Sequence, residues 1–360
     1  MRKNTKGFVE VLVLVILLII AIGVLVFFLF SKNLKEASQN PIAKIQQTLR
    51  NTTPTPTPFL FQEMTIPYLR TREFKSTLGE LEKVSENQNY TSYVTSYESD
   101  GFKIYGLLTI PRDVPTTASG QRLPAIIFIH GYIPPEEYET LVNYASYVDF
   151  LARNGFVVFK IDLRGHGNSE GESGGGYYSG DYVIDTLNAY SALKASNFVD
   201  PDRIGLWGHS MAGNIVMRAF AAKPEVPATV IWAGAGYTYT DLQEYSIEDN
   251  SYRPPPPDTE RARKRQLLRD TYGSFDENHW FWEQVAPTNY LSDLKGSVQL
   301  NHAVNDNVVS IEYSRNLMRL LDTTNIYHEL NEYSSGGHNL TGNTFTQAMQ
   351  NTVEFFKKNL

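Results

Sequence analysis

The sequence predicts an α/β fold, in which a mainly parallel sheet is covered by helices on both faces. Three observations lead to this prediction. Short apolar runs typical of strands alternate with longer amphipathic stretches typical of helices. Residues 125–129 are apolar without a break, as expected for a strand buried on both faces. The chain has 360 residues, enough for one large domain of about 250–300 residues with additional segments.

The expected elements follow one another in a regular order. Two strand-like runs flank Ser99-Asp100-Gly101, a sequence typical of a hairpin turn. Strands and helices then alternate from residue 125 to the end of the chain. The expected strands are 93–97, 102–110, 125–129, 156–161, 203–207, 228–233, 297–303 and 325–330, and the expected helices are 136–154, 181–196, one directly after Ser210, 310–321 and a last one from Thr344.

Residues 236–294 interrupt this alternation. They contain four consecutive prolines at 254–257, a charged helical stretch around 261–270 and the aromatic sequence Trp280-Phe281-Trp282. We interpret this segment as a small cap insertion over the functional site. Its basic residues are more typical of a solvated helix face than of a surface that recognises substrate charge.

The N-terminal segment predicts a membrane anchor. Residues 11–30 are apolar but for Gly23, and a helix of that length spans about 30 Å, the thickness of a bilayer core. The basic residues within 1–10 favour a cytoplasmic N-terminus and an extracytoplasmic remainder. Alternating threonine and proline then predict an extended linker over 31–62, followed by a catalytic domain at 63–360.

Composition excludes several classes of site. The formal net charge of −7 gives no indication of nucleic-acid binding. The absence of cysteine excludes disulfides, thiolate zinc sites and cysteine nucleophiles. The sequence also lacks a His-Glu-x-x-His motif, so neither a metal nor a cofactor is expected.

Ser210 is the predicted nucleophile. It lies in Gly208-His209-Ser210-Met211-Ala212, between an apolar strand and a helix. This is the pattern of a nucleophile elbow, a sharp turn that exposes a serine hydroxyl and requires small residues two positions before and after it. Ala212 replaces the usual glycine with one additional methyl group. A serine hydroxyl is a weak nucleophile alone, so the elbow predicts an acid and then a histidine later in the chain.

Asp306 and His338 are the predicted partners of that serine. Asp306 follows an apolar strand in a polar loop, where its carboxylate could orient an imidazole; the alternative is a helix-capping or turn residue. Asp293 and Asp322 are less well placed. His338 follows the last strand in a glycine-rich loop, which could return it to the carboxyl edge of the sheet, where ligands bind in open α/β sheets.

The oxyanion of an acyl-transfer reaction needs two preorganised N–H donors. We assign these to the backbone of Met211, directly after the nucleophile, and of Tyr132, after the first core strand. His130, Arg164 and His209 are candidate substrate contacts, although a packing role is favoured for Arg164.

These segments together resemble the α/β-hydrolase superfamily. The stretch from Val199 to Ser210, with the hairpin around Asp100, is closest to the catalytic domain of prolyl oligopeptidase family serine peptidases, over roughly residues 90–360. The resemblance implies an α/β-hydrolase fold and the same triad of Ser210, Asp306 and His338. Many members of that family carry an N-terminal β-propeller, for which the segment between anchor and domain is too short, so their selection of peptide ends cannot be transferred.

The sequence therefore predicts a membrane-anchored, single-pass serine hydrolase that cleaves peptide bonds. The alternative substrate is a carboxylic ester, since esterases share every motif named above. Two other classes stay open. One is a non-catalytic surface module that only binds, and the other is a pilin-like subunit, suggested by the prepilin-like sequence Lys6-Gly7-Phe8-Val9-Glu10.

Overall fold

The computed structural model describes residues 58–112 and 122–360. Residues from Leu60 to Leu360 form one compact unit. The predicted anchor at 11–30 and nearly all of the predicted linker lie outside the described residues. Within the described ranges, no helix is both long and apolar enough to cross a membrane.

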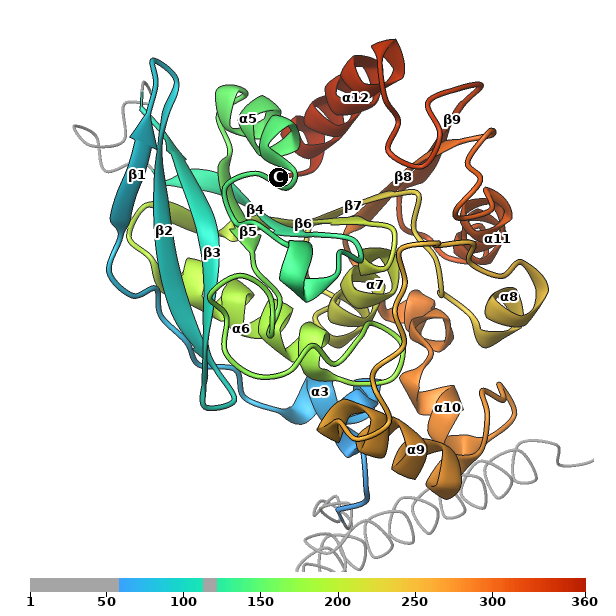
Figure 1. Cartoon of the computed structure of the whole chain (residues 1–360). Helices are drawn as coiled ribbons and strands as arrows, with labels where there is room; N and C mark the ends of the chain where they lie inside the picture. The colour runs from blue at the N-terminus through green and yellow to red at the C-terminus, as the bar shows by residue number, and fades with distance from the viewer. Residues whose placement is uncertain (1–57, 113–121) are drawn as a thin grey trace, which may run out of the picture. The chain divides into compact units, whose positions relative to one another are not determined.

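A sheet of nine strands in the order β1-β2-β3-β5-β4-β6-β7-β8-β9 runs through the described part of this unit (Figure 1). Strands β1 to β3 pair antiparallel, as do β3 and β5, and every other pair is parallel. The mainly parallel sheet predicted from the sequence is therefore confirmed. The strands are β1 (Glu82–Glu86), β2 (Tyr90–Ser99), β3 (Phe102–Pro111), β4 (Leu123–Ile129), β5 (Val157–Ile161), β6 (Val199–His209), β7 (Ala228–Trp232), β8 (Ser297–Ala303) and β9 (His328–Tyr333).

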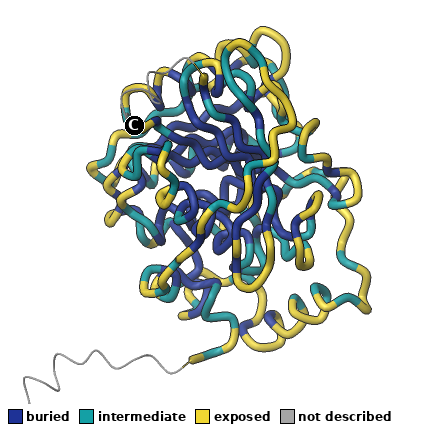
Figure 2. The backbone as a smooth tube through the Cα atoms, turned by 90° about the vertical axis from the view of Figure 1, so that its left-hand side faces the viewer, coloured by how far each residue is buried: buried dark blue, intermediate teal, exposed yellow. Residues whose placement is uncertain are grey.

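Helices cover both faces of the sheet. Helices α5 (Ala145–Arg153) and α12 (Asn343–Asn359) pack on one face, and α6 (Asp181–Ala195) and α7 (Ala212–Ala222) pack on the other (Figure 1). Helix α11 (Glu312–Leu321) packs beside β9. Each face has its own apolar core, and Figure 2 shows the buried backbone at the centre of the unit with exposed segments around it. Strands β5 and β7 are buried at every residue because both faces of the sheet are covered.

Two predicted elements differ from the structure, and one strand of the structure was not predicted. The stretch predicted as one helix at 136–154 is a short 3-10 turn, η2 (Pro135–Glu137), followed by a non-helical loop and then α5. The last strand begins at His328 rather than at 325. Strand β1 was not predicted, because all of its residues are exposed and its sequence lacks an apolar run.

The cap segment divides into two parts. Its helices are α8 (Tyr239–Glu244), α9 (Glu260–Tyr272), α10 (Trp280–Val285) and the 3-10 helix η3 (Pro287–Asp293). Helix α10 contacts the N-terminal helix α3 (Ile66–Thr71), and η3 contacts α7. A short stretch of the cap instead joins the loop after β8, where Ile247 forms a β-bridge with Val309. This stretch therefore reaches the loop that carries the predicted acid, where the Glu248 N–H also donates to the Val308 carbonyl (2.9 Å).

Candidate active site

Ser210 lies in a sharp turn between β6 and α7. Its φ angle of 57° is in the left-handed region, which residues other than glycine rarely adopt. The turn is fixed by hydrogen bonds from the Ser210 N–H to the Trp232 carbonyl (2.9 Å) and from the Gly213 N–H to the Ser210 carbonyl (2.9 Å). A Cβ atom at Gly208 would lie 3.0 Å from the Ala212 carbonyl oxygen, which explains the requirement for a small residue there. This is the geometry of a nucleophile elbow.

Asp306 occupies the loop after β8, and its side chain is fully buried. One carboxylate oxygen accepts the N–H groups of Val308 (2.8 Å) and Val309 (3.0 Å). The other is 2.8 Å from Nδ1 of His338 and 3.1 Å from Nε2 of His302. Burial alone would raise the pKa of Asp306, but hydrogen bonds from the two histidines outweigh it and hold the pKa well below its ordinary value. The carboxylate therefore stays ionised.

His338 follows β9 in a loop that is bent by Gly336 and Gly337, both at positive φ. The Gly337 N–H donates to the Asn305 side chain (3.0 Å), which ties this loop to the one that carries Asp306. Because ionised Asp306 accepts at Nδ1 of His338, that nitrogen carries the proton and Nε2 is left with a free lone pair. A base in this tautomer can accept a proton from a serine hydroxyl.

Ser210 and His338 line one cavity of about 560 Å³. Its walls come from the loop after β4, the start of α5, the elbow, the cap stretch, the loops after β8 and β9, and the start of α12. Helices α9 and α10 contribute no residue to these walls. The lining residues are Gly131, Tyr132, Ile133, Asn143, Tyr144, Ser146, Tyr147, His209, Ser210, Asp249, Ser251, Val308, His338, Asn339, Thr341, Gly342 and Phe345.

Met211 and Tyr132 are the two residues whose backbone amides were predicted to bind the oxyanion. Met211 directly precedes α7, so its N–H is at the N-terminal end of that helix, where amides have no intrahelical acceptor and the helix dipole favours negative charge. Tyr132 lines the cavity from the loop after β4. Its hydroxyl accepts the Arg253 N–H of the cap (3.1 Å), which joins the cap stretch to the loop after β4.

Two of the predicted substrate contacts lie away from this cavity. His130 is fully buried, with Nδ1 2.7 Å from the Gly131 carbonyl oxygen. Arg164 is 5% exposed and forms two bonds with Asp185 (2.9 and 2.6 Å) and one with Asp181 (3.2 Å). Neither lines the cavity of Ser210. His130 therefore lies outside the cavity in which substrate contact was expected, and the buried ion pairs of Arg164 are those of the packing role favoured for that residue.

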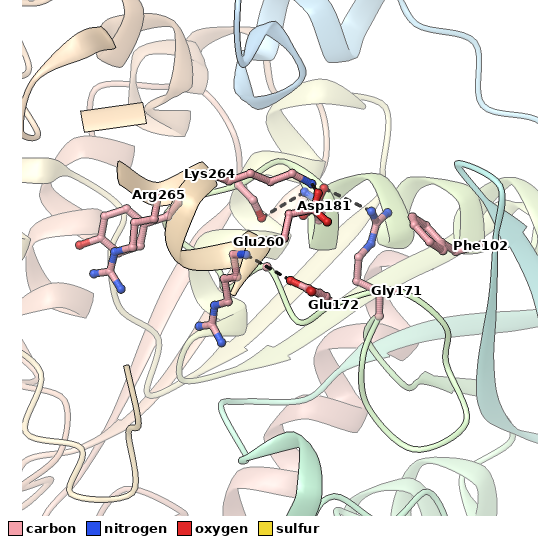
Figure 3. Close-up of a pocket in the computed structure, with 12 residues that line it drawn as sticks. Phe102, Gly171, Glu172, Asp181, Glu260, Lys264 and Arg265 are labelled. Atoms are coloured by element: carbon pink, nitrogen blue, oxygen red, sulfur yellow. Dashed lines mark hydrogen bonds and ion pairs between the residues drawn. The ribbon is translucent and has the colours of Figure 1, made fainter. Parts of the chain in front are cut away.

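Arg164 instead borders a second cavity of about 200 Å³ beside α9 (Figure 3). Lys264 there pairs with Glu260 (2.8 Å), and the Arg261 N–H donates to Glu172 (3.1 Å). Of the basic side chains of α9, that of Lys264 is therefore paired with a carboxylate, while the Arg265 guanidinium lies over the Tyr178 ring at 3.6 Å from its centroid. Among the described residues, no cluster of His, Cys, Asp and Glu could hold a metal ion.

His209, the third predicted substrate contact, does line the catalytic cavity. Its Nδ1 is 2.7 Å from the Tyr144 hydroxyl, and its Nε2 is 3.0 Å from the His338 carbonyl oxygen. Both ring nitrogens therefore have partners within the protein. The sequence does not predict the bonds of Tyr144 or His302. Tyr144 belongs to no motif and its partners are distant in the sequence, and His302 lies in the segment of the predicted acid without a pattern that indicates its bond to Asp306.

The chain is similar to several known proteins, and the matched family segment includes Ser210. Residues 120–248 match the family model described as serine aminopeptidase, S33. The chain is 31% identical to human dipeptidyl peptidase 8 over 180 residues, which are 48% of this chain and 19% of that protein. It is 26% identical to esterase YjfP of Escherichia coli over 216 residues, 56% of this chain and 76% of that protein. The part of this chain that matches thus spans about a fifth of the length of the dipeptidyl peptidase.

A solved structure shows the same fold. Acetyl xylan esterase 1 from Thermoanaerobacterium sp. superposes with a TM-score of 0.56 at 20% identity, covering 83% of this chain and 95% of that one. With the elbow and the mainly parallel sheet, these matches define the class. The chain belongs to the α/β-hydrolase superfamily. The proteins matched above are named as peptidases and esterases.

Proposed function

We propose that this enzyme cleaves peptide bonds through Ser210, His338 and Asp306. The supporting observation is the 2.8 Å hydrogen bond between Asp306 and Nδ1 of His338, whose ring shares a cavity with a serine in a strained elbow. The matches to a serine aminopeptidase model and to a dipeptidyl peptidase favour an amide substrate. Esters are the second candidate, favoured by the greater share of each esterase that the chain spans.

The proposed reaction has two steps. Ser210 Oγ attacks the acyl carbon while its proton passes to Nε2 of His338, and the N–H groups of Met211 and Tyr132 bind the resulting oxyanion. His338 then returns the proton to the leaving amine or alcohol as its bond to carbon breaks. A water molecule attacks the acyl-enzyme and gives its proton to His338. The carboxylic acid leaves, and the proton returns to Ser210.

A substrate panel separates the two candidates. The full-length protein in detergent would be assayed on dipeptidyl, aminoacyl and proline-containing peptide amides and on acetyl, butyryl and feruloyl esters. A peptidase is expected to show a kcat/KM for its best amide within about tenfold of that for its best ester. Hydrolysis of esters alone would reject the peptidase assignment and support the esterase.

We also propose that residues 11–30 anchor the enzyme in a membrane with the catalytic domain outside the cytoplasm. The support is the apolar length of this segment and the basic residues before it. Full-length protein is expected to sediment with membranes after a carbonate wash and to be cleaved by protease added to spheroplasts. A variant without residues 11–30 should appear in the soluble fraction. Equal sedimentation of both proteins would contradict the anchor.

A further inference from the structure

A row of hydrogen bonds connects three loops that carry different parts of the site. The Gly131 N–H donates to the Tyr144 hydroxyl (3.0 Å), which lies 2.7 Å from Nδ1 of His209. Nε2 of His209 lies 3.0 Å from the carbonyl oxygen of His338. The row begins at Gly131, next to the proposed oxyanion donor Tyr132. It continues through His209, the residue before Ser210, and ends at the backbone of His338, the proposed base.

The protons in this row can be arranged in only one direction. The Gly131 amide can only donate, and the His338 carbonyl can only accept. The Tyr144 hydroxyl therefore donates to Nδ1 of His209, and Nε2 of His209 carries the proton that reaches His338. Burial and the neighbouring His338 lower the pKa of His209 to about 3, so the ring stays neutral, as this arrangement requires.

Two backbone features accommodate the Tyr144 hydroxyl. Tyr144 has a φ of 62°, a left-handed conformation that costs a non-glycine residue about 1–2 kcal/mol. A Cβ atom at Gly131 would lie 2.8 Å from this hydroxyl and 3.2 Å from Nδ1 of His209. The loop after β4 therefore leaves room for the hydroxyl only because residue 131 has no side chain. Strain of this kind persists where the surrounding structure holds it in place.

We propose that Tyr144 and His209 are positioning residues. They hold the backbone of His338, and therefore its Nε2, where it can accept the proton of the Ser210 hydroxyl. The proposal rests on the proposed hydrolase function. Asp306 restrains the His338 ring through Nδ1, while His209 restrains the main chain of the same residue. With both nitrogens of His209 engaged inside the protein, its role is to orient the base rather than to bind substrate.

Loss of the row is expected to lower kcat rather than raise KM. Tyr144→Phe leaves the Gly131 N–H and Nδ1 of His209 unpaired, and His209→Leu leaves the His338 carbonyl without its donor. Displacement of a catalytic group by about 1 Å can cost about 10²-fold in rate. We expect kcat to fall about 10- to 100-fold in either variant, with KM within about threefold. His209→Gln keeps an amide donor near the Nε2 position and should recover most of the activity.

The test uses a fluorophosphonate probe on the full-length protein in detergent. Ser210 Oγ bonds to phosphorus, the phosphorus–fluorine bond breaks, and the serine proton passes to His338. The labelling rate therefore reports the attacking pair without knowledge of the substrate, and kcat and KM on the best ester complete the measurement. Tyr97→Phe is the matched control, because its buried hydroxyl donates to the Asp185 carbonyl (2.9 Å) away from the cavity.

The outcomes separate the two hypotheses. If the wild-type protein labels no faster than Ser210→Ala, the hydrolase function itself fails. If the wild type labels but Tyr144→Phe and His209→Leu label at its rate, or change only KM or thermal stability as Tyr97→Phe does, the positioning role is rejected. The expected result is slow labelling in both variants and a double variant no slower than the worse single one. Fully multiplicative losses would show that the two residues do not act as one row.

Discussion

Replacement of Ser210 by alanine is expected to lower kcat about 10⁶-fold and to abolish fluorophosphonate labelling. The hydroxyl is the atom that forms the acyl-enzyme, and loss of the nucleophile alone removes nearly the whole contribution of a triad in a serine hydrolase. The measurement is kcat on the best substrate of the panel, with labelling of purified protein as a second readout. Ser196→Ala, at the end of α6, is the control and should label normally. Retained labelling of Ser210→Ala would place the nucleophile elsewhere.

A glycine variant at the same position checks the elbow independently of chemistry. At a φ of 57° the Cβ of alanine or serine costs about 1–2 kcal/mol, which glycine avoids. The greater entropy of glycine in the unfolded chain offsets part of this gain. Ser210→Gly is therefore expected to be about 0.5–1 kcal/mol more stable than Ser210→Ala in denaturant unfolding, with both inactive. A less stable glycine variant would argue against a strained turn at this serine.

The sequence predicts the central sheet well because its strands are marked by local features. An unbroken apolar run indicates that its own residues are buried. A glycine in the elbow indicates crowding at its own position, and Gly208 indeed has no room for a side chain. The exposed strand β1 has no such pattern and depends on pairing with β2. The helix predicted at 136–154 is interrupted between Glu137 and Ala145. Tyr144, in the left-handed conformation, ends that loop, and its hydroxyl contacts Gly131 and His209, which are distant in the sequence.

Side-chain roles are harder to predict than positions. A packing role was favoured for Arg164, but its partner could not be predicted: the guanidinium is buried against Asp185, because a buried cation without a partner would be costly. His302 and Tyr144 contribute through bonds to Asp306 and His209, and those partners are known only once the chain is folded. The order of serine, acid and histidine could be predicted from the sequence because the elbow itself implies its partners. The hydrogen bonds that orient these three side chains could not be predicted from the sequence.

Substitution of Asp306 by asparagine is expected to lower kcat about 10⁴-fold while the protein remains folded. The asparagine oxygen can still accept the Val308 and Val309 amides, so its NH₂ group turns toward His338. Nδ1 of His338 must then accept, its proton moves to Nε2, and the ring can no longer take a proton from Ser210. Asp322→Asn is the matched control: that carboxylate is 70% exposed, contacts His328, and should leave kcat within about twofold.

The same substitution has a pH signature in stability. The pKa of Asp306 is lowered on folding, so its carboxylate stabilises the native state above the unfolded pKa of about 3.9 and loses that effect as pH falls toward the folded value. The wild type should exceed Asp306→Asn in unfolding free energy by about 1–3 kcal/mol between pH 5 and 7, and the margin should shrink below about pH 4. A margin that grows on acidification, or an Asp306→Asn enzyme as active as Asp322→Asn, would mean that another group orients the base.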